Sequence, residues 1–176
     1  MNRWHDILQT PKGRVAALAG AIVVADQITK LLVTRFLGFQ MDEVIVSGFF
    51  KLVHWGNTGS AFSFFTGNNR WLSIVAAVAL VVLYLARHHF DARSPLGLVS
   101  FGLLFGGILG NLIDRLRVGH VIDFLYFYIE RSGGREIGFP AFNIADSAIC
   151  VGVSLVFYNT WRAEAAKRTA DTTAEG

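Results

Sequence analysis

Four apolar stretches alternate with shorter polar segments along the chain. They cover about residues 15–37, 70–87, 95–114 and 141–161. Each is close to the roughly 20 residues that an α-helix needs to cross about 30 Å of hydrocarbon. The pattern therefore predicts an all-α membrane protein built as a bundle of four transmembrane helices.

The two longer connections, about residues 38–69 and 115–140, have a different pattern. In the first, residues 44–46 and 49–55 are rich in β-branched and aromatic side chains and are bounded by glycine. Such runs are typical of short strands. We expect a small β-sheet that forms, with the second loop, a cradle at one end of the bundle.

Basic residues indicate how the helices are oriented. Cytoplasmic segments of membrane proteins carry an excess of Lys and Arg. We therefore expect both termini in the cytoplasm and both longer loops outside, although Arg115, Arg117, Arg131 and Arg135 on the outer side weaken the bias. The residues expected inside are Arg3, Lys12, Arg14, Arg87, Arg93, Arg162, Lys167 and Arg168.

The two ends of the chain allow further expectations. Basic residues before the first apolar stretch also occur in secretory signal peptides, but no polar cleavage region follows Ala21, so we expect the segment to be retained as a span. Residues 169–176 are small and polar, which predicts a disordered tail.

Composition supports a membrane protein of one domain, residues 1–176. Hydrophobic residues make up 53% of the 176 and charged residues only 16%, with a mean hydropathy of +0.45. Soluble domains carry about 25% charged residues. The net charge of +3 is small and follows the topology, so we expect no nucleic-acid partner. The single cysteine, Cys150, excludes a disulfide within the chain.

Several polar residues lie inside the apolar stretches, where they are costly. Asp26 and Lys30 are four residues apart, so we interpret them as an ion pair on one helix face, with Lys30 reaching toward the membrane surface. Gly102, Gly106 and Gly110 form a stripe that allows another helix to approach closely. We expect that helix to belong to the same chain, with a homodimer as the alternative.

Two acidic residues lie at the same expected depth near the outer surface. Asp123 has apolar neighbours on both sides, and Asp146 lies about five residues into the fourth stretch. Asn143 shares a helix face with Asp146 and could also cap the helix. Asn111, Asp114 and Arg115 share a face at the end of the third stretch, where the last two could be an ordinary solvated helix end.

Two carboxyl groups held close together share one proton near neutral pH, because both cannot ionise cheaply. The ionised member can then take a proton from water while the protonated member donates one to a peptide carbonyl. This chemistry predicts an aspartic peptidase that needs no metal or other cofactor. Taken alone, the two residues indicate a pathway for protons or ions almost equally well.

Five ordered blocks decide between these alternatives, because in them the chain resembles the lipoprotein signal peptidases, the bacterial signal peptidase II family. The resemblance runs over about residues 14–161. The blocks are residues 26–30 (Asp-Gln-Ile-Thr-Lys), 57–62 (Asn-Thr-Gly-Ser-Ala-Phe), 110–115 (Gly-Asn-Leu-Ile-Asp-Arg), 121–124 (Val-Ile-Asp-Phe) and 142–146 (Phe-Asn-Ile-Ala-Asp).

The resemblance implies a function and a role for each polar residue. The enzyme would remove signal peptides from prolipoproteins, cutting before a cysteine that carries a diacylglyceryl group, at the outer face of the bacterial cytoplasmic (inner) membrane. The family is inhibited by the cyclic peptide globomycin, and we expect a monomer among membrane lipids. Asp123 and Asp146 would be the catalytic dyad. Residues that would bind the substrate backbone or support the dyad are Asn57, Asn111, Arg115 and Asn143. Residues that would be structural are Asp26, Lys30 and Asp114.

Other peptidase classes fit the sequence poorly. Ser60 and His54 share a loop, but the Gly-x-Ser-Gly of rhomboid-type enzymes is absent. A Ser–Lys enzyme using Lys30 and a Gly-x-Gly-Asp intramembrane peptidase are not supported either. The histidines lack the His-Glu-x-x-His spacing of metallopeptidases. A proton-coupled transporter or channel component is the non-enzymatic alternative.

Overall fold

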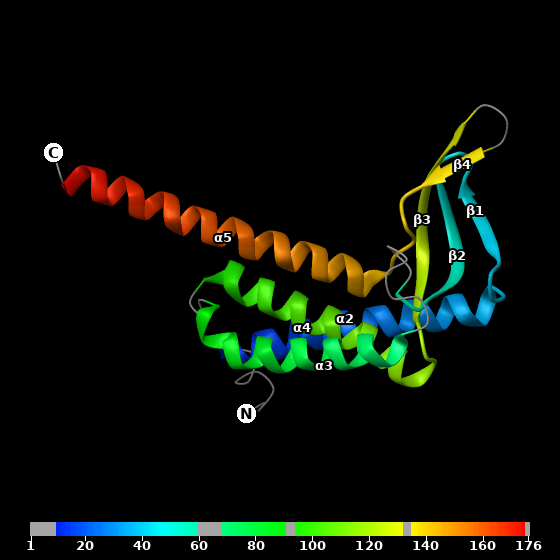
Figure 1. Ribbon diagram of the computed structural model, residues 1–176, viewed down its shortest axis with the longest axis horizontal. Helices are drawn as coiled ribbons and strands as arrows, with labels where there is room; N and C mark the ends of the chain where they lie inside the picture. Colours follow the sequence, from blue (N-terminus) through cyan, green and yellow to red (C-terminus); the bar gives the residue numbers. More distant parts are fainter. Residues whose placement is uncertain (1–9, 60–67, 91–93, 132–134, 175–176) are drawn as a thin grey trace, which may run out of the picture.

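The computed structural model describes residues 10–59, 68–90, 94–131 and 135–174 (Figure 1). Four helices of the described chain are long and apolar enough to cross a membrane, as the sequence predicted. The helices are α2 (Pro11–Phe36), α3 (Asn69–Leu85), α4 (Pro95–Arg117) and α5 (Ile144–Ala174), and a short 3-10 helix, η2 (Ala86–His89), follows α3. The strands are β1 (Asp42–Val46), β2 (Phe50–Asn57), β3 (Val121–Arg131) and β4 (Arg135–Gly138).

The four strands form one antiparallel sheet in the order β1-β2-β3-β4. It lies across one end of the bundle, roughly perpendicular to the helices (Figure 1). The expected cradle is therefore present, and it contains more regular structure than the sequence indicated. Residues 121–131 and 135–138 are strands, where the sequence predicted an outer loop.

Helix α5 begins and ends later than predicted. Its expected first residues are extended instead, because Phe142 pairs with Leu125 of β3 through backbone hydrogen bonds. At the other end the helix continues to Ala174, and so includes most of the tail for which the sequence predicted disorder. Residues 163–167 (Ala-Glu-Ala-Ala-Lys) have high helix propensity, which favours this extension.

Helix α4 lies at the centre of the bundle, and its glycines explain the close packing. A Cβ atom on Gly106 would lie 2.8 Å from the backbone oxygen of Ala19 in α2. A Cβ atom on Gly107 would lie 2.5 Å from the backbone oxygen of Ala145 in α5. The glycine stripe therefore serves contacts within the chain, as expected, and α4 touches a neighbour on each of these two sides.

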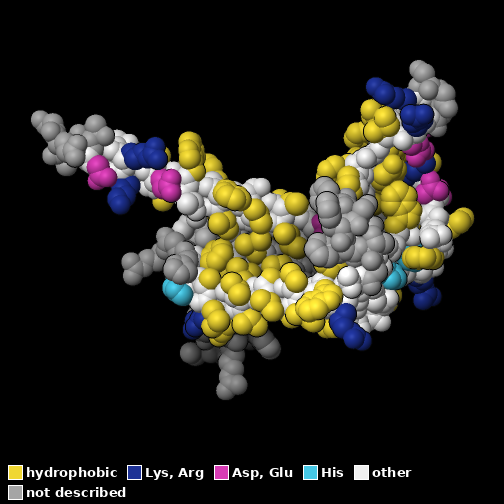
Figure 2. Space-filling model, viewed as in Figure 1, with side chains coloured by type: hydrophobic (Ala, Val, Ile, Leu, Met, Phe, Trp, Pro, Cys, Tyr) yellow, Lys and Arg dark blue, Asp and Glu magenta, His cyan; other side chains and the backbone are white. Residues whose placement is uncertain are grey.

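The outside of the bundle is apolar. Hydrophobic side chains cover the visible face of the helices, whereas Lys and Arg gather toward the ends of the molecule (Figure 2). More than a third of the side chain is exposed at apolar positions along α2 and α3, which include Val24, Ile28, Leu31, Val75, Val78 and Val81. This distribution is that of a surface in contact with lipid rather than water.

Candidate active site

The sheet and helix α5 bring Asp123 and Asp146 to the same place. Asp123 is the third residue of β3 and Asp146 the third residue of α5. The backbone pairing between Leu125 and Phe142 holds the start of α5 beside β3. Asn143 donates to both carboxyl groups, from its side chain to Asp123 and from its backbone to Asp146, so the two acids lie near each other, as the sequence predicted.

Each carboxylate oxygen of this pair accepts one hydrogen bond. Asp123 accepts from Asn57 Nδ2 at 2.9 Å and from Asn143 Nδ2 at 2.8 Å. Asp146 accepts from Asn111 Nδ2 at 2.7 Å and from the backbone N–H of Asn143 at 3.3 Å. Three of the four residues proposed as support for the dyad therefore contact it directly.

The amide groups of these asparagines are oriented by donors to their oxygen atoms. Asn57 Oδ1 accepts from the backbone N–H of Gly59, whose positive φ of 104° suits glycine. Asn143 Oδ1 accepts from the backbone N–H of Asp146 at 2.8 Å. Asn111 Oδ1 accepts from Lys30 Nζ at 3.0 Å. Because an amide presents oxygen on one side and N–H groups on the other, each Nδ2 is turned toward a carboxylate.

Asn143 belongs to both halves of the site. It caps α5, since its side chain accepts from the N–H of Asp146 while its own N–H donates to the Asp146 side chain. Its Nδ2 also donates to Asp123 on β3, and the side chain is completely buried. The suspected helix cap is confirmed, and the same residue links the two acids.

Burial changes the acidity of Asp123, which is 3% exposed and lies outside the spans. Loss of hydration, and to a smaller extent the nearby charge of Asp146, raise the pKa of its carboxyl group from 3.8 to about 7. The amides of Asn57 and Asn143 oppose this rise. At neutral pH a proton is therefore available within the pair.

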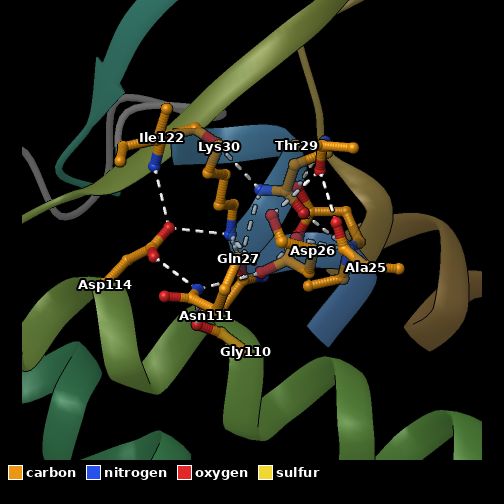
Figure 3. A network of polar contacts seen from close by, with 12 residues as sticks. Ala25, Asp26, Gln27, Thr29, Lys30, Gly110, Asn111, Asp114 and Ile122 are labelled. Carbon is orange, nitrogen blue, oxygen red and sulfur yellow. Dashed lines mark hydrogen bonds and ion pairs between the residues drawn. The ribbon is translucent and has the colours of Figure 1, made fainter. Parts of the chain in front are cut away.

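Beneath the pair lies a buried ionic cluster, seen in Figure 3. Lys30 Nζ lies 2.8 Å from Asp26 and 2.7 Å from Asp114, and all three side chains are at most 3% exposed. The predicted ion pair of Asp26 and Lys30 is present. Two interpretations are wrong: Lys30 points inward rather than toward the surface, and Asp114 is not a solvated helix end. Both errors have one cause, which is that α2 and α4 pack face to face.

Arg115 lies at the end of α4 close to the dyad. Its Nη1 donates to the backbone oxygen of Asn111 at 3.4 Å. Its Nε is buried and, among the described residues, has no hydrogen-bond partner. The charges of Asp146, Asp123 and Asp114 all act on it. Arg115 therefore has a buried N–H group left for another ligand.

Two residues near the site were not singled out from the sequence. Asn69, the first residue of α3, donates from Nδ2 to the backbone oxygen of Arg115 at 3.0 Å. Gln27 donates from Nε2 to Asp114 at 2.8 Å and to Asp26 at 3.2 Å. A polar residue at the edge of an apolar stretch was the available signal in the first case, and the position between Asp26 and Lys30 in the second.

The described residues give little support to a serine peptidase, a Ser–Lys peptidase or a metallopeptidase. His54 is buried, and its Nδ1 lies 2.8 Å from the backbone oxygen of Leu37. Ser60 lies outside the described residues. Lys30 is fully engaged with its two carboxylates and Asn111. No cluster of three His, Cys, Asp or Glu side chains suited to a metal ion occurs among the described residues.

Comparisons with known proteins show which family the chain resembles. Residues 18–162 match the family described as signal peptidase (SPase) II. A lipoprotein signal peptidase of Symbiobacterium thermophilum is 44% identical over 142 residues, which are 80% of this chain and 89% of that protein. One from Azoarcus sp. (strain BH72) is 43% identical and covers 83% of this chain and 81% of its own length.

A solved structure has the same fold. It is described as a bacterial membrane enzyme determined by the in meso method at 2.3 Å resolution. The TM-score is 0.73 with 28% sequence identity, and the match covers 88% of this chain and 92% of that one.

Proposed function

The chain belongs to the signal peptidase II family, the aspartic peptidases that process prolipoproteins, and on that premise we propose that Asp123 and Asp146 are its catalytic dyad. One observation carries the proposal. Asn143 donates to the Asp123 carboxylate and at the same time caps the helix that begins beside Asp146. A single buried amide thus holds two acids from separate elements together, which is the arrangement that two-carboxylate chemistry requires.

In the proposed reaction the pair holds one proton and one negative charge. The ionised carboxylate takes a proton from a water molecule as the water oxygen attacks the scissile carbonyl carbon. The protonated carboxyl donates its proton to the carbonyl oxygen, giving a neutral tetrahedral species. The carboxyl that gained its proton from water then donates it to the amide nitrogen while the other carboxylate takes a proton from a hydroxyl group, so the C–N bond breaks to give an acid and an amine and the pair again holds one proton. Asn57, Asn111 and Asn143 hold the carboxylate oxygens in place throughout.

The proposed substrate is a prolipoprotein whose cysteine carries a diacylglyceryl group, cut just before that cysteine. A lipid-bearing residue stays at the bilayer surface, so the cut must occur at that depth. Asp146 lies in the first turn of a membrane-spanning helix, next to a sheet at the end of the bundle. Arg115 Nε is available to bind a carbonyl of the substrate backbone. Inhibition by globomycin-type cyclic peptides belongs to this proposal.

Replacement of either aspartate tests the dyad. Asp123→Asn and Asp146→Asn keep the side-chain volume but remove the exchange of a proton between the two groups. We expect each to lower cleavage of a diacylglyceryl-modified precursor by at least about 10³-fold, the scale on which acid–base groups act. Purified protein in detergent and a gel-shift assay measure the rate. A mutant that retained near wild-type cleavage would exclude its aspartate from the dyad.

Three controls separate this function from its alternatives. An unmodified precursor tests the lipid requirement, which equal cleavage of both substrates would contradict. A chelator should leave the rate unchanged. Proton flux into liposomes that contain the protein should be the same for wild type and Asp146→Asn, whereas a proton pathway through the dyad predicts loss of flux in the mutant.

A further inference from the structure

The ionic cluster of Asp26, Lys30 and Asp114 (hereafter the clamp) contacts both halves of the active site through the backbone. Asp26 Oδ1 accepts from the N–H of Ala145 at 3.0 Å. Asp114 Oδ2 accepts from the N–H of Ile122 at 3.2 Å. Ala145 immediately precedes Asp146, and Ile122 immediately precedes Asp123. Each acid of the clamp therefore holds the residue before one acid of the dyad.

Lys30 connects these two anchoring points. Its ammonium group lies 2.8 Å from Asp26 and 2.7 Å from Asp114, and its third contact is Asn111 Oδ1 at 3.0 Å. An ammonium group has three N–H donors, and these three acceptors match them in number. The position of Lys30 thereby fixes the distance between the two carboxylates, and with it the separation of the two backbone segments.

The third contact extends the same control to a side chain of the site. A reversed Asn111 amide would place its N–H groups against the ammonium and its oxygen against the Asp146 carboxylate, so both contacts would be repulsive. Together with Asn143 Nδ2, which donates to the same Asn111 oxygen at 3.2 Å, Lys30 thus sets the orientation in which Asn111 Nδ2 donates to Asp146 at 2.7 Å. The contacts of Lys30 with α2 and α4 are visible in Figure 3.

Gly110 is what allows the clamp to close. A Cβ atom at this position would lie 2.8 Å from Asp26 Oδ2. Gln27 Nε2 reinforces the connection, because it donates to Asp26 and to Asp114 as well as to the backbone oxygen of Gly110. These contacts of Asp26, Gln27 and Asp114 join α2, α4, the start of β3 and the start of α5.

We propose that Asp26, Lys30 and Asp114 are positioning residues that set the separation of the two catalytic carboxyl groups. The inference rests on the proposed dyad. Helix stability alone would need only the local pair of Asp26 and Lys30. A purely stabilising role does not explain why Asp114 is buried against the same ammonium group. Nor does it explain why the two acids of the clamp bind the backbone N–H groups of Ala145 and Ile122. A change in the clamp should therefore alter turnover rather than substrate binding.

The isosteric variants Asp26→Asn and Asp114→Asn test this role. Each keeps a carbonyl oxygen for its backbone N–H but weakens the bond to Lys30. We expect each to lower kcat on the order of tenfold and to leave KM within about twofold, because small misplacements of reacting groups act on the chemical step. The two changes should be non-additive, because breaking either end opens the same connection. Wild-type kcat in the variants, or an additive effect of about 100-fold in the double variant, would overturn the proposal.

Two further variants separate positioning from stability. Leu104→Ala removes a buried side chain elsewhere in α4 and should lower the thermal unfolding midpoint without changing kcat below it. If a single Asn variant fails to fold, the neutral triple variant Asp26→Asn, Lys30→Met, Asp114→Asn removes the unpaired buried charge. A folded triple variant with reduced kcat and unchanged KM supports the proposal. A triple variant that has wild-type kcat, or that does not fold, contradicts it by making the cluster a stability element only.

A wild-type protein that fails to cleave the lipid-modified precursor would instead contradict the proposed function. Cleavage by the wild type that is lost in Asp123→Asn, together with full turnover in the clamp variants, would retain the dyad and exclude the positioning role.

Discussion

At the residue scale, Asn143 combines two roles, those of a helix cap and of a hydrogen-bond donor to a carboxylate of the active site. The side chain of Asn143 caps α5 and also donates to a carboxylate on the sheet. Most helix caps are partly solvated and satisfy only the first turn of their own helix. Here the cap is completely buried, so its loss affects both the helix and the acid opposite it.

Asn143→Ala should therefore impair both stability and activity. Loss of a cap costs about 1 kcal/mol, and loss of the bond to Asp123 should lower kcat on the order of 10²-fold. Asn68→Ala is a matched control, because Asn68 stands at the cap position of α3 but makes no capping hydrogen bond. Thermal unfolding and kcat of the two variants measure the difference. Equal effects of the two variants would contradict both roles of Asn143, whereas a loss of stability with unchanged kcat would show that Asn143 acts only as a helix cap.

A second prediction at this scale concerns pH. The pKa of Asp123 is raised to about 7, mainly by burial, and the amide of Asn57 opposes the rise because it stabilises the ionised form. Activity that needs the proton on Asp123 should fall as pH rises through about 7. Asn57→Ala removes a bond to the ionised form, so the pKa rises further and the alkaline limb should move to higher pH. Profiles of kcat against pH measure this limb, and a shift to lower pH would contradict the assignment.

The stability of the folded state should also depend on the titration of Asp123. Asp123 binds a proton between its unfolded value of 3.8 and its folded value of about 7, where the unfolded chain does not. Because the folded state then binds more protons, Asp123 makes the free energy of unfolding decrease as pH rises across that window.

Spacing predicted some residue contacts and missed others for a definite reason. Asp26 with Lys30 and Asn143 with Asp146 are pairs within one helix turn, so their relation is set by helix geometry alone. The contact of Lys30 with Asp114 joins two helices, and no local pattern specifies which faces meet. Asp114 was consequently interpreted as a possible solvated end, although it is 3% exposed.

At the element scale, helix packing depends on small residues in α4. Gly106 and Gly20 provide a test because both are helical glycines with opposite surroundings. A Cβ on Gly106 would lie 2.8 Å from a backbone oxygen and 3.0 Å from the Cα of Ala19, whereas Gly20 has nothing within 4 Å.

Gly106→Ala should destabilise the protein by about 1–3 kcal/mol, because a helix backbone would have to move. Gly20→Ala should be neutral or stabilise it by up to about 1 kcal/mol, because alanine loses less conformational entropy in a helix. Thermal unfolding in detergent measures both. A stabilising effect of Gly106→Ala would mean that α2 and α4 are less closely packed than described.

Element types were predicted where periodicity is strong and missed where pairing is long-range. The four spans follow from apolar length, and the strands of residues 44–46 and 49–55 follow from their composition. Strand β4 could not be predicted, because Arg135–Gly138 contains a single apolar side chain, is exposed, and gains its order from pairing with β3. The late start of α5 has the same cause, since Phe142 is held by β3.

At the scale of the whole molecule, the apolar belt requires a bilayer, and the sheet marks one side of it. With an even number of spans both termini lie on the side opposite the sheet, and the basic residues predict that this side is the cytoplasm. A reporter enzyme that is active only in the cytoplasm should work when fused after Gly176 and fail when inserted at residues 132–134. The reverse result would invert the proposed orientation.

The clamp also joins residues that are translated at very different times during synthesis of the chain. Asp26 and Lys30 lie on one helix face, so they neutralise each other as soon as α2 enters the bilayer. The N–H that Asp26 finally accepts belongs to Ala145, which is translated 119 residues later. Until α5 is inserted, a nascent chain therefore lacks the backbone N–H that donates to Asp26. It also contains at most one of the two proposed catalytic aspartates. Because the two residues of the proposed dyad meet only when α5 is in place, we expect no peptidase activity before the last helix is inserted.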